Sequence, residues 1–142
     1  MPSRPTPFSV DYLPRTHHTL LHKFYRHHKS SMRITEQADA WVVRATEIIA
    51  GVCLSPVAEG FWLTSLFTAP AYRRQGIARL LINHLQDSYV DKPIWLFCHP
   101  QLEKFYCNLD FVTAHQLPEP LKSRLTRYQK NKTLIALCYH HS

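Results

Sequence analysis

The residue types best suited to chemistry gather in one stretch, TAPAYRRQGIARLL, which spans residues 68–81. Gly76 is one of only three glycines in the chain, and it stands between an arginine pair and the start of a helical apolar pattern. The first turn of a helix leaves backbone N–H groups without partners and carries partial positive charge. A glycine there, followed by the small Ala78, predicts a site where a phosphate or pyrophosphate approaches the backbone.

Arg73, Arg74 and Arg79 surround Gly76 with full positive charges. Arginines beside a helix are also common where no ligand binds, so the turn alone leaves an ordinary surface turn open as the alternative. The stretch contains neither G-x-G-x-x-G nor G-K-[ST]. It therefore indicates neither a dinucleotide-binding fold nor a nucleoside-triphosphate P-loop.

Hydrophobic periodicity predicts the elements that must position this turn. Helical spacing indicates helices over residues 15–29, 76–89 and 100–109. Apolar, β-rich runs indicate strands over residues 8–13, 40–46, 48–55, 61–68, 94–98, 111–117 and 132–140. Residues 118–131 form a basic, proline-marked connection between the last two strands. This order predicts an α/β fold with a mixed, mainly antiparallel central sheet of about six or seven strands and helices on both faces.

Length and composition indicate one globular domain over residues 1–142, with a net charge of +7 that favours anionic partners. No apolar run is long enough to cross a bilayer, and the N-terminus lacks a signal-peptide pattern. We therefore expect a cytoplasmic protein with reduced, mostly buried cysteines and no membrane partner. His18 and His22 have metal-ligand spacing, but no carboxylate or cysteine lies close by in sequence, so no metal is expected.

The stretch APAYRRQGIARLL resembles the acetyl-coenzyme A signature of the GNAT superfamily of N-acetyltransferases. That signature, R/Q-x-x-G-x-G/A, corresponds to residues 73–78. EKFYCNLDF, residues 103–111, resembles the second landmark of the family, an aromatic–tyrosine pair followed by Gly-Phe. The predicted order of elements matches the family fold along the whole chain, and the motif detail covers residues 61–111.

The resemblance implies acetyl-CoA as co-substrate, held at its pyrophosphate by backbone N–H groups of residues 74–79. It implies that the end of strand 61–68 pairs with the pantetheine arm and that Tyr106 protonates the departing thiolate as general acid. The reference pKa of tyrosine, about 10, keeps such a donor protonated. The predicted cofactor-binding residues are Leu66, Phe67, Thr68, Arg73, Arg74, Gln75, Gly76, Ile77, Ala78 and Arg79. Taken without the resemblance, Tyr106 reads as a core residue on the apolar side of its helix.

The chain departs from the family pattern at three places. His99 stands near the position of a pantetheine-binding Asn, and Asp110 replaces the Gly of the Gly-Phe landmark, where Asp tolerates a left-handed backbone. Strand 61–68 has no carboxylate, and Glu59 is expected in the turn at its far end. The general base is then ordered water, His99 as the candidate residue, or a carboxylate such as Glu36 or Asp39. Cys98 is not expected to be a nucleophile, because apolar surroundings raise a thiol pKa.

The resemblance implies an N-acetyltransferase in which a primary amine attacks acetyl-CoA directly in a ternary complex. It also implies that the acceptor, a small molecule or a protein, contacts residues 15–40 and 117–131. The arginines and lysines there suit a carboxylate or phosphate group, and an ordinary solvated surface is the alternative. The alternatives are a basic nucleic-acid-binding module, although no nucleic-acid motif is present, or a CoA-binding regulator without transferase activity. The chain is expected to be a monomer or a homodimer.

Overall fold

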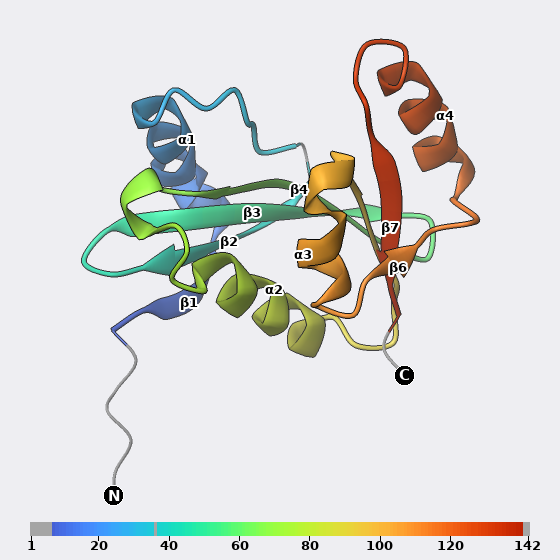
Figure 1. Cartoon of the computed structure of the whole chain (residues 1–142). Helices are drawn as coiled ribbons and strands as arrows, with labels where there is room; N and C mark the ends of the chain where they lie inside the picture. Colours follow the sequence, from blue (N-terminus) through green and yellow to red (C-terminus); the bar gives the residue numbers. More distant parts are fainter. Residues whose placement is uncertain (1–6, 36, 141–142) are drawn as a thin grey trace, which may run out of the picture.

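The computed structural model describes residues 7–35 and 37–140 of the chain (Figure 1). Within them, seven strands form one sheet in the order β1-β2-β3-β4-β5-β7-β6. Every neighbouring pair of strands is antiparallel except β4 and β5, which are parallel. The strands are β1 (Ser9–Leu13), β2 (Asp39–Arg44), β3 (Ile48–Val57), β4 (Gly60–Thr68), β5 (Ile94–Cys98), β6 (Val112–Thr113) and β7 (Ile135–Tyr139). The predicted mixed, mainly antiparallel sheet is confirmed.

Helices cover both faces of this sheet (Figure 1). They are α1 (His18–His27), α2 (Ile77–Ser88), α3 (Glu103–Cys107) and α4 (Glu119–Tyr128), with short 3-10 turns η1 (Arg15–His17), η2 (Pro70–Tyr72) and η3 (Pro100–Leu102). Alternation along β4 shows how the faces divide, since Trp62 packs with Leu121 of α4 while its neighbour Leu63 packs with α2 and α3. Leu21 and Tyr25 of α1 pack on the same face as α4, over β2 and β3.

Helix α4 was not predicted, because residues 118–131 were read as a connection. Leu121, Leu125 and Tyr128 lie at helical spacing, but charged residues and two prolines surround them. Pro118 stands at the N-cap and Pro120 in the first turn, where a proline without an N–H is tolerated. The helix lies wholly within the predicted connection. The strand predicted over residues 111–117 is reduced to β6, Val112 and Thr113.

Helix α2 buries Ile77, Leu81, Ile82 and Leu85, as its apolar spacing predicts. Gln86 is also buried, and its Nε2 donates a 2.7 Å hydrogen bond to the carbonyl of Leu109. This bond ties α2 to the loop that follows α3, and it satisfies a polar group that would otherwise be costly to bury. In the described part of the chain, no helix has the length and apolar character needed to cross a membrane.

Candidate functional site

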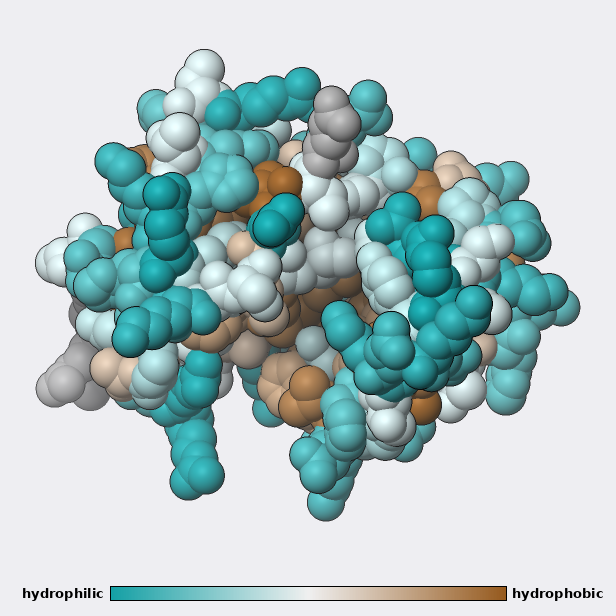
Figure 2. Space-filling model, turned by 90° about the horizontal axis from the view of Figure 1, so that it is seen from above, coloured by the Kyte–Doolittle hydropathy of each residue, from teal (hydrophilic) through white to brown (hydrophobic). Residues whose placement is uncertain are grey.

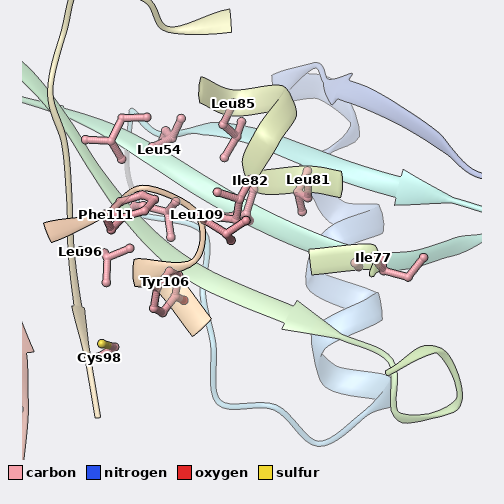
Figure 3. Close-up of a cluster of buried hydrophobic side chains, with 14 of the residues drawn as sticks. Leu54, Ile77, Leu81, Ile82, Leu85, Leu96, Cys98, Tyr106, Leu109 and Phe111 are labelled. Carbon is pink, nitrogen blue, oxygen red and sulfur yellow. The ribbon is translucent and has the colours of Figure 1, made fainter. Parts of the chain in front are cut away.

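Strands β4 and β5 separate soon after they begin. They pair only at Phe61 with Ile94 and at Trp62 with Trp95. Beyond Trp62, β4 keeps its partner β3 on one side and β5 keeps β7 on the other, so the two strands diverge (Figure 3). The edge of β4 from Leu63 to Thr68 therefore faces a gap instead of a neighbouring strand, which leaves it able to pair with an extended chain.

A β-bulge shapes this free edge. The register with β3 shifts between the pairs Gly51–Phe67 and Cys53–Thr64, so β4 carries an extra residue there. Ser65 has a φ of 60°, and its hydroxyl donates a 2.6 Å hydrogen bond to the carbonyl of Arg33. The carbonyl of Ser65 accepts a 2.6 Å bond from the hydroxyl of Tyr25 on α1. These two bonds hold the bulge, and with it the backbone that continues toward Thr68, in one conformation.

The predicted anion turn lies where β4 leads through η2 into α2. Gly76 is the N-cap residue of α2, and its φ of 77° is a left-handed conformation that glycine adopts without strain. A Cβ built at Gly76 would meet no atom within 4 Å, so the space before the helix terminus is open. Glycine is thus favoured here by the backbone conformation, and the open space suits the approach of a phosphate group.

Of the predicted cofactor residues, Arg73 and Gln75 point back to the protein. Arg73 Nε donates a 3.0 Å hydrogen bond to the carbonyl of Thr68, and its guanidinium lies 5.2 Å from the centre of the Phe67 ring. Gln75 Nε2 donates a 3.2 Å bond to the carbonyl of Ala71. These side chains stiffen the turn, and Arg74 and Arg79 are exposed beside it. Their contact with a cofactor stays a prediction.

Tyr106 lies on α3 beside Cys98 of β5, at the β4–β5 gap (Figure 3). It is 6% exposed and packs edge-on against Phe111, with 5.7 Å between ring centres. Burial raises the pKa of Tyr106 above its ordinary value, and the nearby Cys98 raises it further. The phenol is therefore protonated at neutral pH, as a proton donor must be. Asp110, which follows α3, has a φ of 70°, so the predicted left-handed turn is present.

His99 is exposed at the end of β5, where it caps η3. Its Nδ1 accepts a 3.1 Å hydrogen bond from the backbone N–H of Gln101. A neutral imidazole that accepts at Nδ1 carries its proton on Nε2. In this arrangement Nε2 already carries a proton and can only donate. His99 could take up a proton at Nδ1 only if its hydrogen bond with the N–H of Gln101 were broken.

The carboxylates considered as bases lie elsewhere. Asp39 accepts a 2.7 Å hydrogen bond from the hydroxyl of Tyr89, which itself accepts a 2.9 Å bond from Trp41 Nε1. This network joins β2 to the end of α2. Glu59 lies in the turn between β3 and β4, at the end of β4 away from the bulge, as predicted. Glu36 lies outside the described residues. Cys98 is buried, and burial raises its thiol pKa to about 11, which disfavours a nucleophilic thiolate.

Two buried polar atoms on β4 were not predicted from the sequence. Among the described residues, Trp62 Nε1 and Thr64 Oγ1 are buried without any hydrogen-bond partner. They are two residues apart and so face the same side of the sheet, toward α4, where Arg124 lies 4.7 Å from the Trp62 ring centre. The sequence signal that could have indicated the bulge and the buried hydroxyl of Thr64 is the polar pair Thr64-Ser65 inside an otherwise apolar strand.

Figure 2 shows a hollow with an apolar floor on the face that carries α1 and α4, bordered by hydrophilic side chains. The two segments predicted to contact an acceptor, residues 15–40 and 117–131, lie on this same face, in α1 and the loop after it and in α4. The described residues include no cluster of three or more side chains that could hold a metal ion.

The chain matches a family model and has the fold of several solved structures. The family model described as "Acetyltransferase (GNAT) domain" matches residues 9–132. No curated protein sequence matches the chain at a significant level. Among solved structures, the fold is similar to Arabidopsis thaliana Naa50 in complex with the bisubstrate analogue CoA-Ac-MVNAL, with a TM-score of 0.68, 13% identity and coverage of 96% of this chain and 100% of that one.

Two bacterial structures have the same fold. The ribosomal-protein-S18-alanine N-acetyltransferase from Escherichia coli superposes with a TM-score of 0.66 and 15% identity, over 95% of this chain and 96% of that chain. Escherichia coli ElaA superposes with a TM-score of 0.68 and 13% identity, over 94% of this chain and 99% of that chain. At these identities the likeness concerns the fold.

Proposed function

The chain belongs to the GNAT acetyltransferase family, and from that premise we propose that it transfers an acetyl group from acetyl-CoA to a primary amine in the cytoplasm. The observation that carries the proposal is the separation of β4 from β5 after Trp62. A free strand edge suits the amide groups of a pantetheine arm, because these can pair with backbone groups as another strand would. The gap has Tyr106 beside it, and the β4 edge leads on to the open Gly76 turn.

The residues present fit acetyl-CoA at both ends of this path. The N–H groups of residues 76–79 are at the start of α2 and lack helical partners, so they suit a pyrophosphate. A Cβ at Gly76 would stand in the open space before them. At the other end, Leu66 to Thr68 follow the clamped bulge and would orient the acetyl carbonyl. Arg74 and Arg79 would add charge near the phosphates.

In the proposed reaction the amine nitrogen attacks the thioester carbonyl carbon directly, within a ternary complex. A C–N bond forms, the C–S bond breaks, and the departing thiolate takes the proton from Tyr106 Oη, which solvent later replaces. The acceptor nitrogen loses one proton. Because the free nitrogen of His99 is a donor while it caps η3, an ordered water is the base we favour over His99.

We propose that the acceptor, a small molecule or a protein, carries a carboxylate or phosphate group. Helix α4 carries the basic residues Lys122, Arg124 and Arg127 and covers the same face of the sheet as α1, which Arg33 follows in the chain. Such a surface attracts anionic groups and disfavours a polycationic amine. A second candidate function, a CoA-binding regulator without transferase activity, is favoured by one observation: β4 carries no carboxylate.

Two measurements test these functions separately. Saturating acetyl-CoA should raise the unfolding midpoint, because a ligand present at about 100 times its dissociation constant adds about 2.7 kcal/mol to stability. If acetyl-CoA leaves the unfolding midpoint unchanged, both candidate functions are overturned. A screen of amine acceptors that detects released CoA thiol then separates them: release that depends on one class of amine supports the transferase. Stabilisation without release from any amine supports the regulator. Tight, salt-sensitive binding to DNA or RNA without either effect would instead favour a nucleic-acid-binding module.

A further inference from the structure

A cavity of about 520 Å³ lies between α1, the turn of the β2–β3 hairpin and η2. Its lining includes none of Leu66, Phe67, Thr68, Gly76 and Tyr106, so it is separate from the proposed acetyl-CoA path. Cavities of about 300–1,000 Å³ are typical of small-molecule sites. Part of its lining falls within residues 15–40, the segment expected to contact the acceptor, but neither the family match nor the proposed reaction assigns a role to the cavity itself.

The floor of the cavity is apolar. Phe24 of α1, Ile49 of β3 and Ala69 after β4 line it, and all three are buried. Tyr72 of η2 closes one side. Such a surface gains free energy when it covers a hydrocarbon group, at about 25 cal/mol per Å² removed from water.

The rim of the cavity carries more basic than acidic side chains. Lys23 and His27 line it from α1, His28 from the C-cap of that helix, and Arg44 from β2, against the single carboxylate of Glu47. Within residues 7–35 and 37–140 neither Lys23 nor Glu47 takes part in an ion pair. Among the described residues the guanidinium of Arg44 forms an ion pair with Asp11 alone, at 3.4 Å, and a guanidinium has five N–H donors, so it retains donors for a ligand.

We propose that this cavity binds a small organic acid with an apolar body. The carboxylate lies between Lys23 and Arg44, and the hydrocarbon part packs on Phe24 and Ile49. A carboxylate head fits better than an amine, because two permanent cations and two histidines face one acid on the rim. A purely apolar ligand would leave the two cations without a partner. The proposal does not depend on acetyl transfer.

The test uses the full chain labelled with ¹⁵N and three probes: octanoate, octylammonium and acetate. Octanoate should shift the amide signals of α1 and of residues 44–49 in a saturable manner. Octylammonium, which reverses the charge, and acetate, which lacks the tail, should bind at least about tenfold more weakly. Saturable shifts confined to residues near Tyr106, equal binding of octylammonium, or no saturation with octanoate would each overturn the proposal.

Variants then locate the two halves of the site. Lys23→Gln with Arg44→Gln should weaken octanoate binding about tenfold, whereas Arg26→Gln with Lys29→Gln removes the same charge from α1 and its end outside the cavity and should leave binding unchanged. Ala71→Trp places a large ring at the exposed wall and should abolish binding. Thermal unfolding checks that each variant is folded, and equal effects of the two charge pairs would contradict the assignment.

A competition experiment between CoA and octanoate tests whether this cavity is distinct from the proposed acetyl-CoA site. Saturating CoA should not displace octanoate, because the two ligands use different residues. Displacement would mean that octanoate occupies the β4–β5 gap, and the cavity would then have no ligand of this class. If the chain binds no CoA, the octanoate shifts still decide the proposal.

Discussion

The hydroxyl of Tyr25 donates a 2.6 Å hydrogen bond to the carbonyl of Ser65, and so joins α1 to the bulge of β4. Tyr25 is 1% exposed, and burial raises its pKa above the ordinary value, with Cys53 adding to the shift. The neutral phenol is therefore the donor throughout the physiological pH range. Because Ser65 has a left-handed φ, this bond supports a backbone conformation that serine alone disfavours.

Tyr25→Phe should lower the free energy of unfolding by about 1–2 kcal/mol, because it leaves the half-buried Ser65 carbonyl without its partner. Urea denaturation measures the loss. Tyr12→Phe is the matched control. Tyr12 is 48% exposed, so removal of its hydroxyl should change the free energy of unfolding little. If the two variants unfold at the same urea concentration, the clamp on the bulge contributes nothing.

Gly76→Ala should cost about 1–2 kcal/mol of stability through its left-handed φ alone, because no atom stands in the way of the new Cβ. Gly76→Asn should recover much of that loss, since Asn tolerates this conformation. Both variants place a Cβ in the proposed phosphate space, so both should weaken acetyl-CoA binding, measured by calorimetry. Wild-type affinity in Gly76→Asn would mean that the glycine serves the backbone and not the ligand.

Tyr106→Phe should lower kcat by about 10²–10⁴-fold on a true acceptor, because the thiolate loses its positioned proton donor. The dissociation constant for acetyl-CoA should stay close to that of the wild type. Tyr12→Phe is the control, as it removes an exposed phenol from β1, outside the gap and outside both segments expected to contact the acceptor. Unchanged turnover in Tyr106→Phe would assign the tyrosine to the core instead of the chemistry.

The buried thiols predict a loss of stability at alkaline pH. Burial raises the pKa of Cys98 and Cys138 from 9.0 to about 11, and that of Cys53 to about 12. Above about pH 9 the unfolded chain therefore releases thiol protons that the folded chain still holds, so the free energy of unfolding falls as pH rises through this window. Urea unfolding at several pH values measures the slope. Cys53→Ala should reduce it, whereas Cys107→Ser, which changes the exposed cysteine, should not.

Thr64→Val should raise the free energy of unfolding by about 1 kcal/mol, because it replaces an unpaired buried hydroxyl with a methyl group of similar size. Thr35→Val is the contrast, since Thr35 Oγ1 lies 2.6 Å from Ser55 Oγ in a hydrogen bond that the variant loses. If the hydroxyl of Thr64 is kept for contact with a substrate, Thr64→Val should lower turnover while it stabilises the fold. A stability loss equal to that of Thr35→Val would show that Thr64 has a partner in solution.

Much of the architecture follows from local patterns. The 3.6-residue spacing around Leu81 and Leu85 predicted α2, and the apolar runs predicted the strands, because a helix or strand must bury one side whatever its neighbours are. Gly76 also needed only local information, since a left-handed residue before a helix favours glycine. The same holds for the left-handed turn at Asp110.

The tertiary structure decided how these elements meet. Strand pairing has no local signal, so nothing near Trp62 indicated that β5 would leave β4 after two residues. The bulge at Ser65 depends on Tyr25 and Arg33, which lie 40 and 32 residues away in the chain. Helix α4 forms although its prolines and charges suggested a loop, because Leu121 is buried against Trp62.

The sequence by itself thus determined most of the elements and the glycine turn before α2, because each depends on a few neighbouring residues. It pointed to Tyr106 as a candidate acid only through the family resemblance. Only the folded chain could decide that Arg73 turns back onto Thr68, that His99 caps η3, and that Lys23 and Arg44 share a cavity. The last of these joins residues from separate elements, and the first two depend on a side-chain direction that the sequence does not specify. The physical reason is that burial and hydrogen bonding act between surfaces that the chain brings together only when it folds.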